Sequence, residues 1–398
     1  MARRDPRNVF RRSFQRLRLS CGQASPTSRL WFSKREGCSA RETRVIVIVH
    51  RQIYSIHFTF PILFDPFEER AIAVNLPALM LSITVIFIAP AALAQQNNAA
   101  PPSEGFPAWA FLWDPSVKVP PPDDRPNQLA GSNASFSWKQ ARDLFLALDW
   151  HPDDHPAMPE IVATGRKPDV RACGACHRVE GTGGPEGASL AGLPVNYLVQ
   201  QLADFKSGAR KMSGPERPPK TMVASAKAMT DAEMHAAAEY FAGLKPRRLI
   251  KVVESEIIPR TGPSRMFYVK SPEGGSEALG ERIVEMPDDG DQFELRDSRA
   301  TFTAYVPVGS LAKGETLAKT GGAGTTVACA GCHGSDLRGA GEIPPIAGRS
   351  PTYIVRQLHE FQTGGRVASA SALMKPTVEK LSANDMIALA AYVASLAP

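Results

Sequence analysis

The pentapeptide Cys-x-x-Cys-His occurs twice, and it constrains the fold more than any other feature of the chain. Two thiols three positions apart can form thioethers with the two vinyl groups on one edge of a heme, and the adjacent His then lies under the iron as an axial ligand. The sequence therefore predicts two heme c groups. The residues predicted to bind them are Cys173, Cys176 and His177 in the first motif, and Cys329, Cys332 and His333 in the second.

Other functions of a Cys-x-x-Cys pair fit less well. Such a pair can be a redox dithiol or half of a zinc site. Here a His follows each pair directly, no thioredoxin-like strand pattern surrounds the pairs, and no further Cys or His pair lies nearby. The two remaining cysteines, Cys21 and Cys38, lie in the first 94 residues, so the pattern indicates no disulfide framework.

The two motifs belong to an internal repeat. Thirteen positions separate each motif His from an aligned apolar residue, and further residues correspond after it. The aligned residues are Leu190, Tyr197 and Phe205 in the first copy and Ile346, Tyr353 and Phe361 in the second.

Each copy has a helical pattern. We expect a short helix before the motif, at 159–165 and at 310–320, then a middle helix with apolar residues at helical spacing. A capping box begins the last helix in both copies, formed by Thr230 with Glu233 and by Ser382 with Asp385.

The second axial ligand decides between carrier and catalyst, because a Met thioether closes the iron site and raises its potential, whereas an open site suits peroxide or gas chemistry. Met222 and Met374 occupy the same register in the repeat, each in a predicted loop ahead of the last helix. They are the predicted ligands. The alternatives are that both fill gaps in the core, and that Met212, out of register, serves in the first copy.

A His that binds a metal through one ring nitrogen usually donates the N–H of the other to a backbone carbonyl, and the sequence predicts which carbonyl each motif His uses. Pro344-Pro345 would supply a rigid carbonyl for His333, and Ala188-Ser189 a less stiff one for His177. We therefore expect the two hemes to differ in potential.

The positive charge of the chain is concentrated at its front. Residues 1–94 hold 14 Lys+Arg and 6 Asp+Glu of the chain's 46 and 40, which leaves a net charge of −2 for the remainder. A nucleic-acid-binding surface is therefore not predicted.

The apolar stretch 75–94 ends in Ala-Leu-Ala and precedes a polar, Pro-rich segment, as a secretory signal peptide does. We predict cleavage after Ala94 and export to the periplasm. An uncleaved membrane anchor is the rival, and Pro77 and Pro90 argue against it. Because a signal rarely lies so deep in a chain, we expect the true start near Val74 or Met80, with residues 1 to about 70 an over-extended reading frame.

Two regions lie outside the repeat. Residues 95–157 are Pro-rich at their start, with one predicted helix over Trp138–Leu148 capped by Ser137. His151 and His155 flank an acidic turn there, for which a solvated loop is favoured over a metal site. Residues 246–309 carry short β-like runs and are predicted to form a β-rich insert packed between the modules. The runs are 249–258, 266–270, 282–286, 293–296 and 302–308.

The motifs together resemble a known family. Cys-x-x-Cys-His, P-x-[IL]-A-G, Y-[IL]-V-x-Q-L-x-x-F-x-x-G-x-R, a Met and an L-[ST]-x-x-[DE]-M helix are similar to tandem class I diheme cytochromes c, of the cytochrome c-four kind. The first copy departs from this pattern, because Ala188 stands where the P-x-[IL]-A-G motif of the second copy has Pro344. The resemblance covers about residues 158–245 and 308–398 and also extends to cytochrome subunits of periplasmic dehydrogenases.

The resemblance implies a mainly α chain, with two class I cytochrome c helical domains in tandem and a small β-rich insert between them. The expected segments are 1–94 as leader plus signal peptide, 95–157 as an N-terminal extension, 158–245 and 310–398 as the heme domains, and 246–309 as the insert.

The function implied is single-electron transfer through two His/Met-ligated hemes, with no catalytic residues. Periplasmic redox proteins are the expected partners, a dehydrogenase as donor and an oxidase or reductase as acceptor, and peripheral membrane association stays open. The alternatives are a cytochrome subunit of a periplasmic dehydrogenase complex and a diheme peroxidase-type enzyme. The paired Met residues and the lack of a spare Cys speak against the enzyme.

Overall fold

The computed structural model describes residues 29–33, 43–49, 52–58, 107–114, 116–118, 121–211 and 219–398. The chain divides into two units, Met1–Asn98 and Ala99–Pro398. In the first unit, β1 (Arg29–Ser33), β2 (Thr43–Val49) and β3 (Gln52–Phe58) form an antiparallel sheet in that order. The predicted signal peptide 75–94 and the cleavage after Ala94 lie outside the described residues. Within them, no helix has the length and apolar character needed to cross a bilayer.

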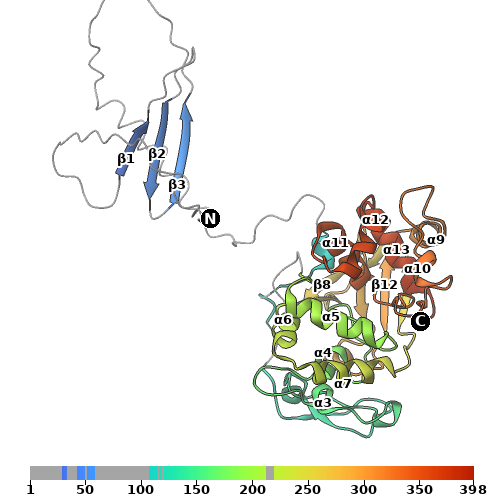
Figure 1. Cartoon of the computed structure of the whole chain (residues 1–398). Helices are drawn as coiled ribbons and strands as arrows, with labels where there is room; N and C mark the ends of the chain where they lie inside the picture. The colour runs from blue at the N-terminus through green and yellow to red at the C-terminus, as the bar shows by residue number, and fades with distance from the viewer. Residues whose placement is uncertain are drawn as a thin grey trace, which may run out of the picture. The chain divides into compact units, whose positions relative to one another are not determined.

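Two groups of helices make up most of the second unit (Figure 1). The first group consists of α3 (Glu160–Ala163), α4 (Cys173–His177), α5 (Val195–Ser207), α6 (Pro219–Ala228) and α7 (Asp231–Ala242). The second consists of α9 (Ser310–Thr320), α10 (Ala330–His333), α11 (Pro351–Thr363), η3 (Ser369–Met374), α12 (Lys375–Val378) and α13 (Ala383–Ser395). The predicted helix 310–320 is confirmed, and we call the two groups the first and second modules.

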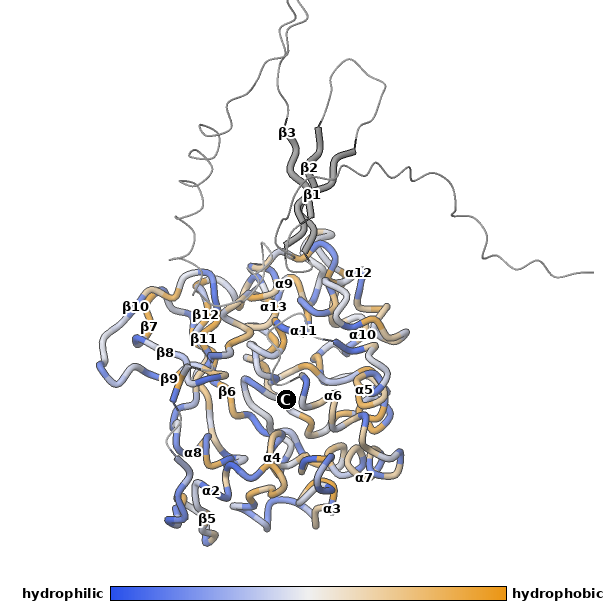
Figure 2. Tube along the Cα trace, turned by 90° about the vertical axis from the view of Figure 1, so that its left-hand side faces the viewer, coloured by the Kyte–Doolittle hydropathy of each residue, from blue (hydrophilic) through white to orange (hydrophobic). Residues whose placement is uncertain are grey.

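Each module has its own apolar core. In the first, Leu198 of α5 and Phe241 of α7 are buried in one cluster. In the second, Leu389 and Val393 of α13 pack against α9 and α11. Figure 2 shows hydrophobic and hydrophilic residues mixed along these helices, as expected for elements with one face inward. Burial of one such large side chain contributes about 1.5–3 kcal/mol.

Both predicted capping boxes are present. Thr230 Oγ1 accepts a hydrogen bond from the Glu233 amide at 3.2 Å, while the Glu233 carboxylate accepts one from the Thr230 amide at 2.7 Å. Ser382 and Asp385 repeat the arrangement, at 3.2 and 2.9 Å. Each box satisfies two amides that have no partner inside the helix, and so fixes where α7 and α13 begin.

Between the modules the chain forms short strands. They are β6 (Ile250–Glu254), β7 (Ile257–Pro259), β8 (Thr261–Ser264), β9 (Phe267–Lys270), β10 (Ser276–Ala278), β11 (Val284–Pro287) and β12 (Phe302–Val306). In one sheet β12 lies between β11 and β6, antiparallel to β11 and parallel to β6, with Phe302 opposite Ile250. Two-stranded pairs join β8 to β9 and β7 to β10.

The β-like reading of residues 293–296 is wrong. Gly290–Glu294 forms the short helix α8, whose first turn is capped by the Asp289 side chain, which accepts from the Gln292 amide at 3.0 Å. The Asp side chain competes for the backbone locally, and Phe293 is buried from a helix instead of a strand.

The helix predicted over Trp138–Leu148 is much shorter than expected. Ser137 caps it as predicted, but α2 ends at Ala141. The Leu144 carbonyl accepts from the Ala172 amide at 2.9 Å, and the Ala147 amide donates to the Ala163 carbonyl at 2.8 Å. These tertiary backbone bonds replace the helical ones. The region also holds η1 (Ala108–Ala110), β4 (Pro126–Asn127), β5 (Phe136–Ser137) and η2 (Pro152–Asp154).

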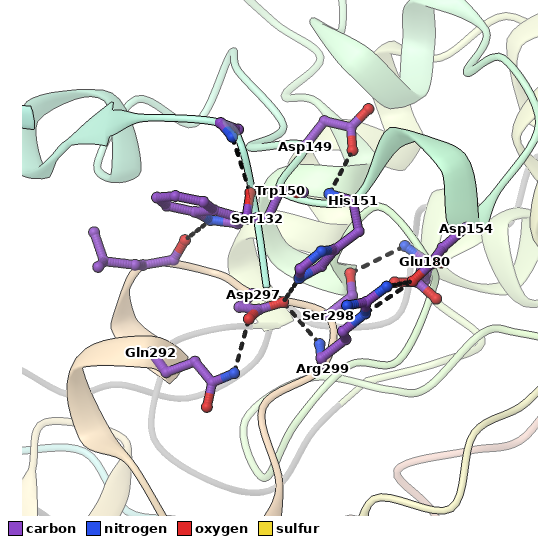
Figure 3. A network of polar contacts seen from close by, with 12 residues as sticks. Ser132, Asp149, Trp150, His151, Asp154, Glu180, Gln292, Asp297, Ser298 and Arg299 are labelled. Carbon is purple, nitrogen blue, oxygen red and sulfur yellow. Dashed lines mark hydrogen bonds and ion pairs between the residues drawn. The ribbon is translucent and has the colours of Figure 1, made fainter. Parts of the chain in front are cut away.

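The acidic turn with its two histidines is not a solvated loop. His151 Nε2 lies 3.0 Å from Asp297 Oδ1, with both side chains buried (Figure 3). His155 Nε2 lies 3.1 Å from Asp149 Oδ1. Asp154 accepts from Arg247 and Arg299. The error arose because Asp297, Arg247 and Arg299 lie about 90 to 150 positions away in the sequence from the side chains that they contact.

The segment between the modules contacts both of them. The buried Glu285 of β11 accepts from Ser350 Oγ at 2.7 Å and from the Thr352 amide at 3.1 Å, at the start of α11. On the other side, the Arg178 guanidinium donates to the Phe293 carbonyl at 3.2 Å. Through β11 and α8, this segment therefore helps to fix each module relative to the other.

The capping box of α7 makes stability depend on pH. A hydrogen bond from Arg166 holds the pKa of Glu233 at about 2, below its ordinary value of 4.5. Because the folded pKa is depressed, the stabilisation is present above about pH 4.5 and is lost as the pH falls towards 2.

We expect Glu233→Gln, which keeps the cap but removes the charge, to lower the free energy of unfolding by about 0.2–1 kcal/mol at pH 7. Thermal unfolding at pH 7 and pH 3 measures this, and the difference should shrink at pH 3. Glu239→Gln, exposed on the same helix, is the control; a pH-independent loss in Glu233→Gln would contradict the prediction.

Candidate heme sites

Each Cys-x-x-Cys-His motif forms one helical turn followed by a sharp reversal of the chain. The residue after the His has a positive φ in both copies, 66° at Arg178 and 85° at Gly334. Past this reversal, the Gly183 amide donates to the His177 carbonyl and the Gly339 amide donates to the His333 carbonyl. The reversal turns the chain back beneath the His ring, which brings the next carbonyls to it.

Both motif histidines are held by a backbone carbonyl. His177 Nδ1 donates to the Ala188 carbonyl at 2.8 Å, and His333 Nδ1 donates to the Pro344 carbonyl at 2.8 Å. The positions predicted for these acceptors are confirmed. Burial lowers the pKa of both imidazoles, so each is neutral and leaves Nε2 free to bind a metal.

The first thiol of each motif is unreactive as a free group. Burial raises the pKa of Cys173 to about 12 and that of Cys329 to about 11. A thiol with such a pKa stays protonated at neutral pH and is a poor nucleophile, which argues against a redox dithiol. Among the described residues, no group of three or more His, Cys, Asp or Glu side chains is placed to hold a metal ion.

One cavity brings together all eight residues that the sequence singled out. Its volume is about 1470 Å³, larger than the roughly 300–1,000 Å³ typical of a pocket for one small ligand. The predicted residues that line it are Cys173, Cys176, His177, Met222, Cys329, Cys332, His333 and Met374.

The two methionines do not lie in loops as expected. Met222 lies in α6, and Met374 is the last residue of η3. Pro219 begins α6. Pro376 lies in the first turn of α12, a helix that begins directly after Met374. Proline fixes the φ angle that a first helical turn requires, so these Pro-containing segments form short helices. The competitor Met212 lies outside the described residues.

Buried arginines line the same cavity, and the sequence analysis did not single them out. They are Arg178, Arg210, Arg349, Arg356 and Arg366. Burial lowers the pKa of Arg178 and of Arg349 to about 10. Among the described residues, Nε and Nη1 of Arg178, Nε of Arg349 and Nε of Arg366 have no hydrogen-bond partner.

Arg178 has a partial counter-charge in the Glu186 carboxylate, 3.6 Å away. The five buried guanidiniums of the lining still call for further negative charge in the cavity, because a buried cation without an anion is destabilising. The propionates of a heme supply such charge. The donor set therefore fits heme, because the lining holds thiols, neutral imidazoles and cations. A hint was available in the sequence, because Arg210 and Arg366 occupy the same place in the repeat.

The repeat also builds the contact between the modules. Gln357 Oε1 accepts from Arg210 at 2.9 Å and from Arg366 at 3.0 Å. Gln201 Oε1, its counterpart, accepts from the same two arginines at 3.0 and 2.6 Å. Each amide oxygen thus accepts one hydrogen bond from an arginine of the first module and one from an arginine of the second. All four side chains are buried. The network joins the modules by symmetric, fully shared bonds at the wall of the cavity.

Comparisons with known proteins agree with this geometry. The family model described as cytochrome c matches residues 162–245 and 311–397. The thiosulfate dehydrogenase electron acceptor of Thiomonas intermedia (strain K12) is 28% identical over 231 residues, 57% of this chain and 80% of the relative. Cytochrome c4 of Azotobacter vinelandii is 26% identical over 267 residues, which cover 64% of this chain and 96% of the relative. Cytochrome c-554(547) of Halothiobacillus neapolitanus is 34% identical over 96 residues, which cover 22% of this chain and 98% of the relative.

The shared network predicts a strong effect from a small change. Gln357→Leu removes the acceptor of two buried guanidiniums, and we expect it to lower the free energy of unfolding of the heme-loaded protein by about 1.5–3 kcal/mol. Chemical denaturation followed by circular dichroism measures the loss. Gln128→Leu, at an exposed position outside both modules, is the control and should change stability by less than about 0.5 kcal/mol. Equal losses in both variants would show that the shared acceptor is not what stabilises the contact.

Proposed function

The chain belongs to the cytochrome c family, and from that premise we propose that it is a periplasmic electron carrier whose two hemes are held by the residues lining the shared cavity. It carries two heme c groups and transfers electrons, and it is not an enzyme in its own right. The observation that carries the proposal is the single cavity, which brings both motifs and both methionines together.

The proposed attachment follows the repeat. Cys173 and Cys176 hold the first heme, with His177 and Met222 as axial ligands, and Cys329, Cys332, His333 and Met374 do the same for the second. The heme domains are proposed at 158–245 and 310–398, with a β-rich insert at 246–309. When bound, heme iron supplies the one-electron chemistry, and the protein holds each imidazole neutral and oriented through its carbonyl partner.

The buried arginines have a second role in this proposal. Positive charge close to a heme stabilises its reduced form, because reduction removes one positive charge from the iron. Arg178, Arg349 and Arg356 line the cavity and are buried, so their fields are little screened by water. They therefore raise the potentials of both hemes as well as pairing the propionates.

The methionine ligands are tested by spectroscopy. We expect Met222→Ala and Met374→Ala each to halve the weak absorption that a Met–iron bond gives at the red end of the ferric spectrum, and the double variant to abolish it, since each substitution removes one thioether ligand. Met229→Leu, buried in the core of the first module, should leave the band unchanged. A full band in either Ala variant would assign the ligand elsewhere, with Met212 the next candidate in the first module.

The proposed donor is a periplasmic dehydrogenase. Two relatives carry the name thiosulfate dehydrogenase electron acceptor, in Thiomonas intermedia (strain K12) and Stutzerimonas stutzeri (strain A1501). These names support a second candidate function, in which the chain is a cytochrome subunit that stays bound to its dehydrogenase. Export rests on the apolar stretch 75–94.

Purification from the periplasm separates the two candidates. A tagged mature protein that elutes alone, and whose hemes are reduced only when a dehydrogenase and its substrate are added, supports the freely diffusing carrier. Constant co-elution with a dehydrogenase at one-to-one stoichiometry supports the subunit. Recovery of the protein only from the cytoplasm, without heme, would contradict both.

A further inference from the structure

Exposed apolar side chains surround the second motif. Among the described residues, Val327, Ile343 and Leu373 are 51%, 36% and 78% exposed, and all three also line the heme cavity. Val327 lies two residues before Cys329, and Leu373 directly precedes Met374. We call these three residues the apolar rim. Cys332, a predicted heme attachment residue, is itself exposed beside it.

The rim is a property of the second module and not of the repeat. In the first copy, the positions that align with Val327, Ile343 and Leu373 hold Arg171, Gly187 and Thr221. The fold of a module therefore does not require apolar residues at these positions. Their presence on the surface of only one module calls for a reason other than packing.

The segments around the rim also lack charge. Residues 321–335 and 367–374 contain no Asp, Glu, Lys or Arg, whereas residues 165–179, which align with the former, contain five. The exposed Glu342, next to Ile343, accepts from Asn196 at 3.1 Å and marks one border of the uncharged area. The second motif thus opens onto a surface that is apolar and uncharged as far as the exposed Asp336 and Lys375, which border these segments.

The first motif is covered by the segment between the modules. Arg296, at φ 65°, donates to the carbonyl of Ala175, which lies between the two motif cysteines, and to the Ala141 carbonyl at 2.8 Å. Beside it, the Phe293 ring lies 4.5 Å from the Arg178 guanidinium. Arg296 and Phe293 also line the cavity. These side chains cover the first motif where the second has the apolar rim.

From this asymmetry we propose that electrons enter and leave through the second module, where the apolar rim docks a redox protein that presents an apolar, uncharged face around its own cofactor. The first heme is then an inner site that exchanges electrons with the second. The inference rests on the proposed function. A charged partner face would lose hydration against this surface without gaining a counter-charge, so charge complementarity selects an uncharged one.

The expected interface is small and transient, as in other electron-transfer encounters. Because no charge pairs form across it, the association rate should change little with ionic strength, in contrast to an electrostatically steered encounter.

The test uses the reduced, heme-loaded protein and, as probe, a small oxidised blue-copper protein whose copper lies beneath an apolar, uncharged face. We expect Leu373→Asp and Val327→Asp each to lower the second-order rate constant in stopped flow about tenfold, since each forces a carboxylate into the contact. Three variants should keep the wild-type rate: Ile257→Asp and Val308→Asp, which are 63% and 64% exposed away from the motifs, and Arg171→Asp, the counterpart of Val327.

Wild-type rates in the rim variants overturn the proposal, as do equal losses in the three control variants or a rate that falls steeply with salt. Reduction of each variant by ascorbate, with its ferric spectrum, shows that both hemes and both ligands are intact. Hemes that cannot be reduced by ascorbate in the wild type would instead contradict the proposed function, so the two failures are distinguishable.

Discussion

The bond from each motif His to a backbone carbonyl is the interaction on which the site depends. It joins the motif turn to the loop eleven residues later, at Ala188 and at Pro344, and both of these partners line the cavity. The donated proton leaves the opposite ring nitrogen as the only metal-binding atom. Burial supports the same result, because it keeps the imidazole neutral. One contact per module therefore fixes the orientation, the tautomer and the basicity of the ligand.

The two modules use the same parts in different surroundings. Their joint wall is symmetric, since Gln201 and Gln357 each serve the same pair of arginines. Their outer walls are not, because Arg296 covers the first motif and the apolar rim surrounds the second. The two modules are thus alike at the contact that joins them, and differ where each meets the rest of the molecule.

The sequence was informative wherever a local pattern has one physical solution. The motif spacing, the capping boxes at Thr230 and Ser382, and the carbonyl positions behind each His were predicted from neighbouring residues alone. The failures share a different cause. The early end of α2 and the burial of His151 depend on partners far away in the chain, such as Ala172 and Asp297. No local pattern contains that information, and the buried arginines of the cavity were overlooked because arginine is usually exposed.

The parallel pairing of β6 with β12 has a consequence for how such a chain can change. β6 follows the first module and β12 precedes the second, so the strand leaving one and the strand approaching the other run side by side in the same direction. The chain between them leaves at Glu254, at one end of the strand pair, and returns at Phe302, at the opposite end. On the way it carries Glu285, which contacts the second module, and Arg296, which contacts the first. The strand pair itself ties the end of the first module directly to the start of the second. Residues inserted in the excursion away from Glu285 and Arg296 therefore leave this joint between the modules unchanged.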